Sequence, residues 1–339
     1  MKNILVTGGL GYIGSHTVVA LQKEGFNVFI IDDLSNSQLV IWEKITKITG
    51  VQPVYYNIDI KDFDTLSIFF QSHTIHGIIH FAAYKAVGES VVKPLMYYRN
   101  NLMGLMNVLE AMEENKVDNF IFSSSCTVYG QADKMPINEK TPLKRTESPY
   151  GNTKKIGEEI IEDFVKISGK NAFSLRYFNP IGSESQGLLG DLQPIPNNLM
   201  PYILQTAMGI RENLGVYGAD YETRDGTAVR DYVDVNDLAD AHVKAIQRLF
   251  DGKNKLNLEF YNLGSGKGST VLEIVKAFEE TNGLKINYEI KPRRAGDIVE
   301  AYADYSLAKT ELDWEPKIKL ETSMQTAWKF QQILNNVIE

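Results

Sequence analysis

The chain has 339 residues, of which 43% are hydrophobic and 23% charged, as expected for a globular protein with enough apolar residues for one large or two ordinary domains. Its formal net charge of −8 argues against a nucleic-acid-binding surface, and no apolar run approaches the roughly 20 residues of a membrane helix. The single cysteine, Cys126, argues against an internal disulfide or a cysteine metal cage, and the early first strand leaves no signal peptide, so we expect a cytoplasmic location.

A glycine-rich turn follows the first predicted strand. Residues 4–6 are typical of a buried parallel strand, and residues 13–21 predict a helix directly afterwards. A strand, a glycine turn and a helix start form an anion site, because free backbone N–H groups and the positive helix end point at the same place. Such a turn needs glycine for tight curvature, for close approach of a pyrophosphate and for helix–strand packing, and we assign these roles in that order to Gly8, Gly11 and Gly14.

Two acidic residues follow the second predicted strand. Residues 28–31 form an apolar run that ends in Asp32 and Asp33, about twenty residues beyond the glycine turn. An acid at this place in a dinucleotide-binding unit accepts hydrogen bonds from the adenosine ribose hydroxyls. No Lys or Arg occurs between Asp32 and Val40 to bind a 2′-phosphate, so the sequence favours NAD over NADP.

The rest of the first half alternates strands with helices. Apolar runs predict further strands at residues 54–58, 77–83, 119–125 and 172–178, and long helices at 95–115 and 149–168. This alternation is typical of a parallel sheet with right-handed crossovers. We therefore predict an α/β fold with a Rossmann-type doubly wound parallel sheet, and a dinucleotide-binding domain at residues 1–180.

The pattern changes after residue 178. Residues 179–201 have the composition of a loop, and the elements beyond them are more widely spaced. Helices are expected at residues 236–250, 271–281 and 320–338, and strands at 260–263 and 286–290. We expect residues 181–339 to form a smaller α/β substrate-binding domain over the strand ends, with segments at about 231–265 packing back on the first domain.

Tyr150 and Lys154 are the candidate catalytic residues. They lie four residues apart at the start of a predicted helix that Ser148 caps, so they share one helix face. A tyrosine hydroxyl has a pKa of about 10, but a neighbouring ammonium and a positively charged nicotinamide both favour the phenolate and lower that pKa. Tyr150 would then take a proton from a substrate hydroxyl, Ser125 would hydrogen-bond the same oxygen, and Lys154 would hold the nicotinamide ribose. Tyr-x-x-x-Lys occurs by chance in many helices, so this interpretation depends on the glycine turn.

These three residues and the glycine turn together resemble the extended short-chain dehydrogenase/reductase superfamily. Further stretches are similar to the UDP-glucose 4-epimerase family, and they lie at residues 7–16, 80–90, 123–130, 176–180, 195–201 and 229–232. The resemblance extends from Lys2 to about Trp314. It therefore covers both predicted domains.

The resemblance implies a reversible, redox-neutral inversion at C4 of a UDP-hexose. In that family tightly bound NAD takes a hydride from C4, the 4-keto sugar turns over, and the hydride returns to the opposite face, which interconverts UDP-glucose and UDP-galactose. The UDP is held firmly and the hexose loosely enough to rotate. The resemblance also implies a homodimer, formed through helices near residues 95–115 and 150–168.

The family's binding residues are carried over onto this chain one by one. Besides the glycines, Ser125, Tyr150 and Lys154, the implied NAD contacts are Tyr12, Ile13, Asp32, Asp33, Leu34, Ser35, Asn36, Ser37, Asp59, Ile60, Phe81, Ala82, Ala83, Lys85, Asn100 and Phe178. The implied substrate contacts are Asn179, Asn198, Leu199, Tyr217, Arg230, Arg294 and Asp297. The two arginines suit a diphosphate by charge and fork geometry, and Asp297 suits the uridine ribose hydroxyls. The alternative for each arginine is a surface ion pair.

Ala301 bears on the choice of sugar. Residues 293–302 align with the family's sugar pocket, and Ala301 stands where some members carry a bulky Tyr that excludes N-acetylated sugars. A small residue predicts room for a 2-acetamido group, and therefore activity on UDP-GlcNAc and UDP-GalNAc. The alternative is that the neighbouring Tyr302 fills this space. Tyr84, where some relatives carry Leu, is expected to have little effect.

Other functions fit the sequence less well. Another NAD-dependent nucleotide-sugar epimerase or dehydratase of the same superfamily is the alternative, but a dehydratase needs an acid and a base just after Ser125, where this chain has Cys126 and Thr127. A catalytically silent NAD-binding regulator would be expected to lack Tyr150 or Lys154. The five histidines form no constellation with carboxylates, so no metal is expected. The expected partner is a UDP-hexose rather than a nucleic acid or a membrane.

Overall fold

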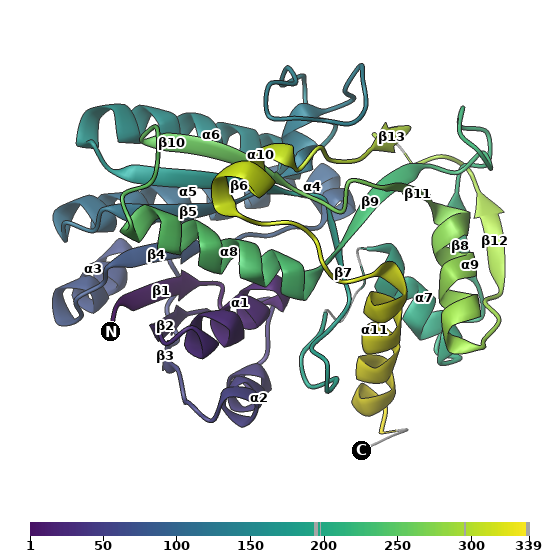
Figure 1. The fold of residues 1–339 in the computed structure, drawn as a ribbon, viewed down its shortest axis with the longest axis horizontal. Coiled ribbons are helices and arrows are strands. Elements are labelled where there is room, and N and C mark those ends of the chain that lie inside the picture. The colour runs from purple at the N-terminus through teal and green to yellow at the C-terminus, as the bar shows by residue number, and fades with distance from the viewer. Residues whose placement is uncertain (193–195, 197, 295, 337–339) are drawn as a thin grey trace.

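The largest element of the fold is a sheet of seven parallel strands. The computed structural model describes residues 1–192, 196, 198–294 and 296–336. The strands of this sheet are β1 (Asn3–Thr7), β2 (Asn27–Ile31), β3 (Val54–Tyr56), β4 (Gly77–His80), β5 (Asn119–Ser125), β6 (Asn171–Tyr177) and β10 (Leu258–Leu263). They lie in the order β10-β6-β5-β4-β1-β2-β3 (Figure 1). Because β1 pairs with both β2 and β4, the strand order reverses there, and open parallel sheets bind ligands in the crevice outside such a reversal.

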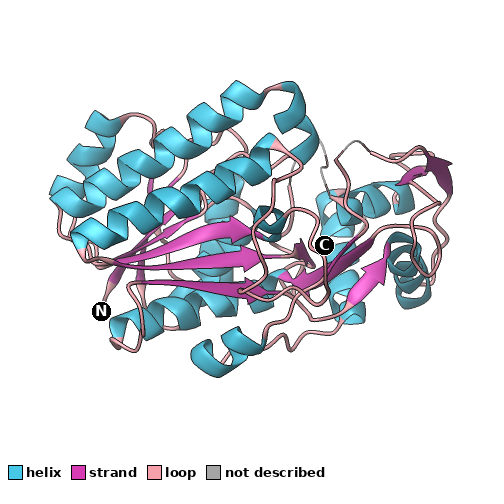
Figure 2. Cartoon of the chain, turned by 90° about the horizontal axis from the view of Figure 1, so that it is seen from above, coloured by secondary structure: helices cyan, strands magenta, loops and turns pink. Residues whose placement is uncertain are grey.

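Helices cover both faces of this sheet, as Figure 2 shows. One face carries α1 (Tyr12–Lys23), α2 (Val40–Thr49) and α8 (Val235–Phe250), and the other carries α3 (Phe63–Ser72), α5 (Pro94–Glu114) and α6 (Pro149–Ser168). The two cores are separated by the alternation of side chains along each strand: Ile4 and Val6 of β1 belong to the core under α1, and Leu5 belongs to the core under α5. This layering confirms the predicted Rossmann-type α/β fold.

The second half of the chain builds a smaller region beyond the carboxyl ends of the large sheet (Figure 1). Its elements are β7 (Asn179–Ile181), α7 (Leu199–Ala207), β8 (Leu214–Tyr217), β9 (Val229–Asp234), β11 (Gly268–Thr270), α9 (Val271–Asn282), β12 (Tyr288–Lys291), β13 (Glu300–Ala301) and α11 (Leu320–Leu334). Strand β9 pairs with β7, β11 and β13, and β8 pairs with β12. Ile203, Val216, Phe278 and Met324 form the centre of a separate core here.

Two elements of the second half return to the large sheet. Strand β10 pairs with β6 along its whole length, and α8 packs against α1. Helix α10 (Ser306–Leu312) lies against β10, and after it the fully buried Trp314 donates a hydrogen bond from Nε1 to Asp237 O of α8 at 2.8 Å. The chain therefore crosses between the two regions several times.

The structure corrects several predicted elements. Residues 179–201 contain β7 and the start of α7 instead of only a loop, and the strand expected at 260–263 is the seventh strand of the large sheet and begins at Leu258. Helices α2, α3, α4 (Val87–Val92) and α10 and strands β8, β9, β11 and β13 were not predicted. The last helix ends at Leu334, and its expected end at Ile338 lies outside the described residues. No helix in the described part of the chain is both long and apolar enough to span a membrane.

Candidate active site

A cleft runs along the carboxyl edge of the large sheet. It is lined by the turn after β1, the loops after β2, β3 and β4, and the start of α6. The sequence-predicted residues that it brings together are Gly8, Gly11, Tyr12, Ile13, Gly14, Asp32, Asp33, Ser35, Asn36, Ser37, Asp59, Ile60, Phe81, Ala82, Ala83, Lys85, Asn100, Tyr150 and Lys154. Leu34, Ser125 and Phe178 do not line it.

The glycine turn is shaped by backbone contacts that exclude side chains. Gly8 has a φ of 68°, and a Cβ added to it would lie 2.7 Å from Ala82 N. A Cβ added to Gly14 would lie 2.3 Å from Gly8 O, so the start of α1 packs directly on the turn. Helix α1 begins at Tyr12 without a side-chain cap, which leaves its first N–H groups directed at the cleft. This cradle fits a pyrophosphate.

Asp32 organises the loop in which an adenosine ribose is expected. Its carboxylate accepts hydrogen bonds from Leu10 N and Leu34 N, both at 3.0 Å, and from Ser37 Oγ at 2.6 Å. Burial raises the pKa of Asp32, and these hydrogen bonds oppose the rise. The lysines that line the cleft are Lys85 and Lys154, and neither comes from the loop after β2. The site therefore suits an unphosphorylated ribose.

The start of α6 places Tyr150 and Lys154 in the cleft. Ser148 Oγ accepts a hydrogen bond from Gly151 N at 3.1 Å, and Pro149 occupies the first turn, so the helix begins as predicted. Lys154 is 3% exposed and donates from Nζ to Ser123 O at 2.5 Å. This contact joins α6 to β5 two residues before Ser125, the residue at the end of the same strand.

Burial controls the protonation of both candidate catalytic groups. It raises the pKa of Tyr150 to about 12, with the Ser125 hydroxyl opposing the rise, and it lowers the pKa of Lys154 to about 7, with Glu158 opposing the fall. The prediction that neighbouring protein groups lower the Tyr150 pKa is therefore wrong, because the desolvation of the buried phenol raises the pKa more than these neighbours lower it. The charge of a bound nicotinamide would have to supply that lowering.

The predicted substrate residues form a second group around β9. The Arg230 guanidinium pairs with the Asp297 carboxylate, and Arg294 stacks on the Tyr217 ring with 4.0 Å to its centroid. The two residues expected to contact the diphosphate and the ribose thus contact each other. Asn179 begins β7, and Asn198 and Leu199 lie at the start of α7.

This second group lies close to the start of α6. A Cβ added to Gly296 would lie 2.9 Å from Glu147 O, three residues before Tyr150, and Val299 N donates to Gln131 Oε1 at 3.0 Å. Ala301 is buried in a cluster that contains Phe178 and Tyr129. Ile195, Asn197 and Ala295, which belong to the motifs at 195–201 and 293–302, lie outside the described residues.

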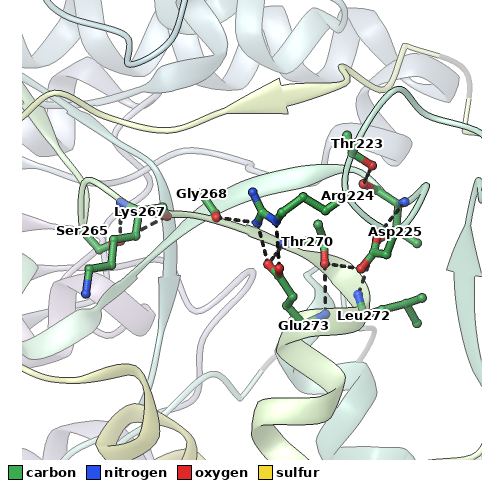
Figure 3. A network of polar contacts seen from close by, with 10 residues as sticks. Thr223, Arg224, Asp225, Ser265, Lys267, Gly268, Thr270, Leu272 and Glu273 are labelled. Atoms are coloured by element: carbon green, nitrogen blue, oxygen red, sulfur yellow. Dashed lines mark hydrogen bonds and ion pairs between the residues drawn. The ribbon is translucent and has the colours of Figure 1, made fainter.

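A polar network fixes the strands beside Arg230 (Figure 3). Arg224 donates to both oxygens of Glu273, at 2.8 and 2.6 Å, and to Gly268 O at 2.9 Å. Thr270 and Glu273 form a capping box at the start of α9. Since Gly268 belongs to β11, which pairs with β9, this network holds the strand that carries Arg230.

Some residues that line the cleft were not predicted from the sequence. Ser123 and Tyr177 line the cleft, and strand geometry could have predicted both. Ser123 lies on the same face of β5 as Ser125, and Tyr177 of β6 is the register partner of Ser125. Asp191 also lines the cleft and lies 3.6 Å from Lys85 Nζ, but no sequence pattern indicated it. Among the described residues no group of three or more His, Cys, Asp or Glu side chains is placed to hold a metal ion.

Comparisons with known proteins place this architecture among nucleotide-sugar enzymes. A family model described as GDP-mannose 4,6 dehydratase matches residues 5–327. A UDP-glucose 4-epimerase of Neisseria meningitidis serogroup A is 48% identical over 333 residues, which cover 97% of each chain. The solved UDP-glucose-4-epimerase of Stenotrophomonas maltophila, with bound NAD and formylated UDP-arabinopyranose, has a TM-score of 0.95 and 43% identity, with 100% of both chains covered. That of Bifidobacterium longum, in complex with NAD+ and UDP, has a TM-score of 0.95 and 42% identity, with 99% of this chain and 100% of that chain covered.

Removal of the buried lysine tests the electrostatics of the site. Since the pKa of Lys154 falls from 10.5 to about 7, the unfolded chain binds a proton between these pH values that the folded chain lacks, and the free energy of unfolding decreases as the pH falls through this range. We expect Lys154→Met to raise the free energy of unfolding near pH 7 by roughly 2 kcal/mol and to flatten its pH dependence. Urea denaturation of the dinucleotide-free protein at several pH values measures both.

Lys155→Met is the matched control, because Lys155 is the next residue and is only half-buried. It should keep the wild-type pH dependence. A Lys154→Met protein whose unfolding free energy has the same slope against pH as the wild type would contradict the burial argument.

Proposed function

The chain belongs to the UDP-glucose 4-epimerase family, and from this membership we infer the roles of individual side chains. It is an NAD-dependent enzyme of this family and interconverts UDP-glucose and UDP-galactose at C4. NAD, when bound, takes a hydride from C4 and returns it to the other face of the 4-keto sugar. The chain's own residues have to bind the dinucleotide, hold the UDP, and move the proton of the sugar hydroxyl.

The observation that carries the proposal is the position of Tyr150 and Lys154 in the same cleft as the glycine turn. Tyr150 removes the proton of the 4-hydroxyl and later returns it, and Ser125 hydrogen-bonds the same oxygen. Lys154 holds the nicotinamide ribose and adds positive charge beside the phenol. The glycine turn and the uncapped start of α1 bind the pyrophosphate, and Asp32 and Asp33 bind the adenosine ribose.

The residues after Ser125 favour epimerisation over dehydration. A dehydratase needs a proton donor and acceptor there, but burial raises the pKa of Cys126 to about 12, and Thr127 carries only a hydroxyl. Neither side chain exchanges a proton readily at neutral pH. The 4-keto sugar therefore has no partner for elimination at this position.

We propose residues 1–180 as the NAD-binding domain and residues 181–339 as the nucleotide-sugar-binding domain, with about 231–265 packing back on the first. In the second domain Arg230 and Arg294 bind the diphosphate and Asp297 binds the uridine ribose. The contact between Arg230 and Asp297 supports a shared site, because both side chains reach the same point before a ligand arrives. Asn179, Asn198, Leu199 and Tyr217 complete the substrate contacts.

Tyr150→Phe tests the central assignment. It removes only the hydroxyl, so we expect kcat for UDP-galactose to fall by about 10²- to 10⁴-fold while the purified protein retains NAD. Coupled assay of UDP-glucose formation measures the first effect, and release of NAD on denaturation measures the second. Tyr98→Phe is the control, since this hydroxyl only accepts a hydrogen bond from Asn152, and it should change kcat little. A Tyr150→Phe enzyme with wild-type kcat would refute the proposal.

Activity on N-acetylated sugars is a second proposal, and Ala301 supports it. The methyl side chain of Ala301 lies in the cluster with Phe178, whereas the ring of Tyr302 lies against β11, because a Cβ added to Gly268 would be 2.9 Å from Tyr302 Cδ1. This position of the ring argues against the alternative in which Tyr302 fills the space expected for the acetamido group. UDP-GlcNAc and UDP-GalNAc are then further substrates.

Ala301→Tyr would place a bulky ring where we expect the 2-acetamido group of an N-acetylated sugar. We expect kcat/KM for UDP-GalNAc to fall by about 100-fold while kcat/KM for UDP-galactose changes by less than about threefold, because a clash with the acetamido group affects only the larger sugar. Chromatography of the nucleotide sugars gives both rates. Ala301→Gly should keep both activities, and a wild-type enzyme inactive on UDP-GalNAc would rule the proposal out.

We propose that the enzyme is a cytoplasmic homodimer that pairs through the helices near residues 95–115 and 150–168. Support comes from apolar side chains at 41% exposure or more on α4 and α5, namely Val87, Val91, Val92, Leu95, Met103 and Met106. The lone Cys126, which has no second cysteine in the chain to form a disulfide with, supports a reducing compartment.

The dimer is tested by light scattering coupled to size-exclusion chromatography. The wild type should have twice the mass of one chain, and Met103→Glu with Met106→Glu should shift it to the monomer, because two carboxylates would be buried without partners. Ile68→Glu on α3, where Ile68 is also exposed, should remain dimeric. A monomeric wild type would exclude the interface.

A further inference from the structure

Glu158 is buried on the catalytic helix, one turn beyond Lys154. It is 4% exposed, and its carboxylate accepts hydrogen bonds from Arg176 Nε at 2.9 Å and Nη2 at 2.7 Å. Ser124 Oγ and Ser174 Oγ donate to the same carboxylate at 2.6 and 2.8 Å. Ser124 lies between Ser123, which accepts from Lys154, and the predicted catalytic serine. Glu158 therefore joins α6 to the two strands that end at the active site.

Arg176 anchors the other side of this contact. Its guanidinium lies 4.9 Å from the Tyr129 ring centroid and 4.5 Å from that of Phe260, and Nη1 donates to Tyr129 OH at 2.9 Å. Tyr129 OH donates in turn to Asn262 Oδ1 at 2.7 Å. The pair is thus fully hydrogen-bonded and connected to β10 and to the 3₁₀ helix η1 (Cys126–Tyr129) that follows β5.

The fold alone does not require these charges. Helix α6 already packs into the core through Ile161 and Val165, and well-packed apolar residues of similar size stabilise proteins as well as a buried ion pair does. Because the Glu158–Arg176 pair lies next to the start of α6, which carries Tyr150 and Lys154, a role in positioning that start is the simpler explanation.

We propose that Glu158 is a positioning residue that acts through Lys154. Held by Arg176, it fixes how far α6 lies along β5, and its negative charge keeps the Lys154 ammonium protonated beside Tyr150. This role rests on the proposed function of Tyr150 and Lys154, and it concerns a residue that does not itself touch substrate or cofactor.

The charges around Lys154 support this role. On α6 the neighbouring ionisable groups are Tyr150 and Glu158, and β6 contributes Tyr177 to the cleft and Arg176 to the Glu158 pair. On β4, His80 is buried and its pKa is lowered to about 3, so it is neutral. Burial pulls the pKa of Lys154 down to about 7, and Glu158 is the group that opposes this fall.

Glu158→Gln tests the proposal by removing the charge while keeping the shape. Without the negative neighbour the neutral amine is favoured, so Lys154 loses its proton at a lower pH. We expect the alkaline limb of kcat for UDP-galactose to move down by about one pH unit, with KM nearly unchanged. Independently of activity, the ¹³Cε resonance of Lys154, assigned with Lys154→Arg, should titrate at a correspondingly lower pH.

Two further variants separate this role from simple support of the fold. Glu158→Asp restores the charge and should restore the pH limb even where kcat is reduced. Glu311→Gln is the control, because it breaks another largely buried ion pair, in which Glu311 is 14% exposed and its partner Arg248 is 12% exposed. This variant should lower thermal stability without moving the pH limb. Should Glu158→Gln alone not fold, Glu158→Gln with Arg176→Met removes both charges and should still move the limb in the same direction, because Glu158 is the charged group that acts on Lys154.

An unchanged pH limb and an unchanged Lys154 titration in Glu158→Gln would overturn the inference. That result would leave the proposed function intact as long as Tyr150→Phe is inactive. An active Tyr150→Phe enzyme would instead refute the proposed function itself, so the two failures are distinguishable.

Discussion

The seating of α6 against the carboxyl ends of β5 and β6 is the contact on which the rest of the site depends. It buries a lysine and a phenol in a place that disfavours the charge of either one. Three kinds of contact hold the helix there: the Ser148 cap and Pro149 at its start, the bond from Lys154 to Ser123, and the Glu158–Arg176 pair one turn further on. A small shift of this helix would move the Tyr150 hydroxyl, to which we assign the proton transfer, away from the cleft.

The two binding regions differ in how far the chain prepares them. On the dinucleotide side, the glycine turn and the Asp32 hydrogen bonds fix the backbone before any ligand is present, which reduces the ordering cost of binding. On the side that we propose binds the sugar nucleotide, Arg230 and Asp297 form an ion pair with each other. A ligand there has to exchange these partners, which suits a cofactor that stays and a substrate that leaves.

Local patterns predicted most of the dinucleotide half. Long apolar runs gave β1, β2, β5 and β6, and the glycine turn, Asp32, Tyr150 and Lys154 came from short motifs whose geometry is local. The strands around β9 were missed, because β7 and β13 have only three and two residues and because charged residues interrupt the apolar residues of β9. The contact between Arg230 and Asp297, which are 67 residues apart, and the raised Tyr150 pKa both depend on tertiary packing, which no local pattern encodes.

Strand β10 has a consequence for how the molecule can be divided. It is contributed by the second half of the chain, yet it forms the outermost strand beside β6. A fragment that stopped at residue 180 would leave the backbone N–H and C=O groups of β6 that pair with β10 without partners, and such sheet edges recruit other chains. The first half of this polypeptide therefore depends on a strand of the second half to cover the edge of its sheet, and gene fusions or split reporters built on it would have to keep residues 1–180 and 258–263 on one continuous molecule.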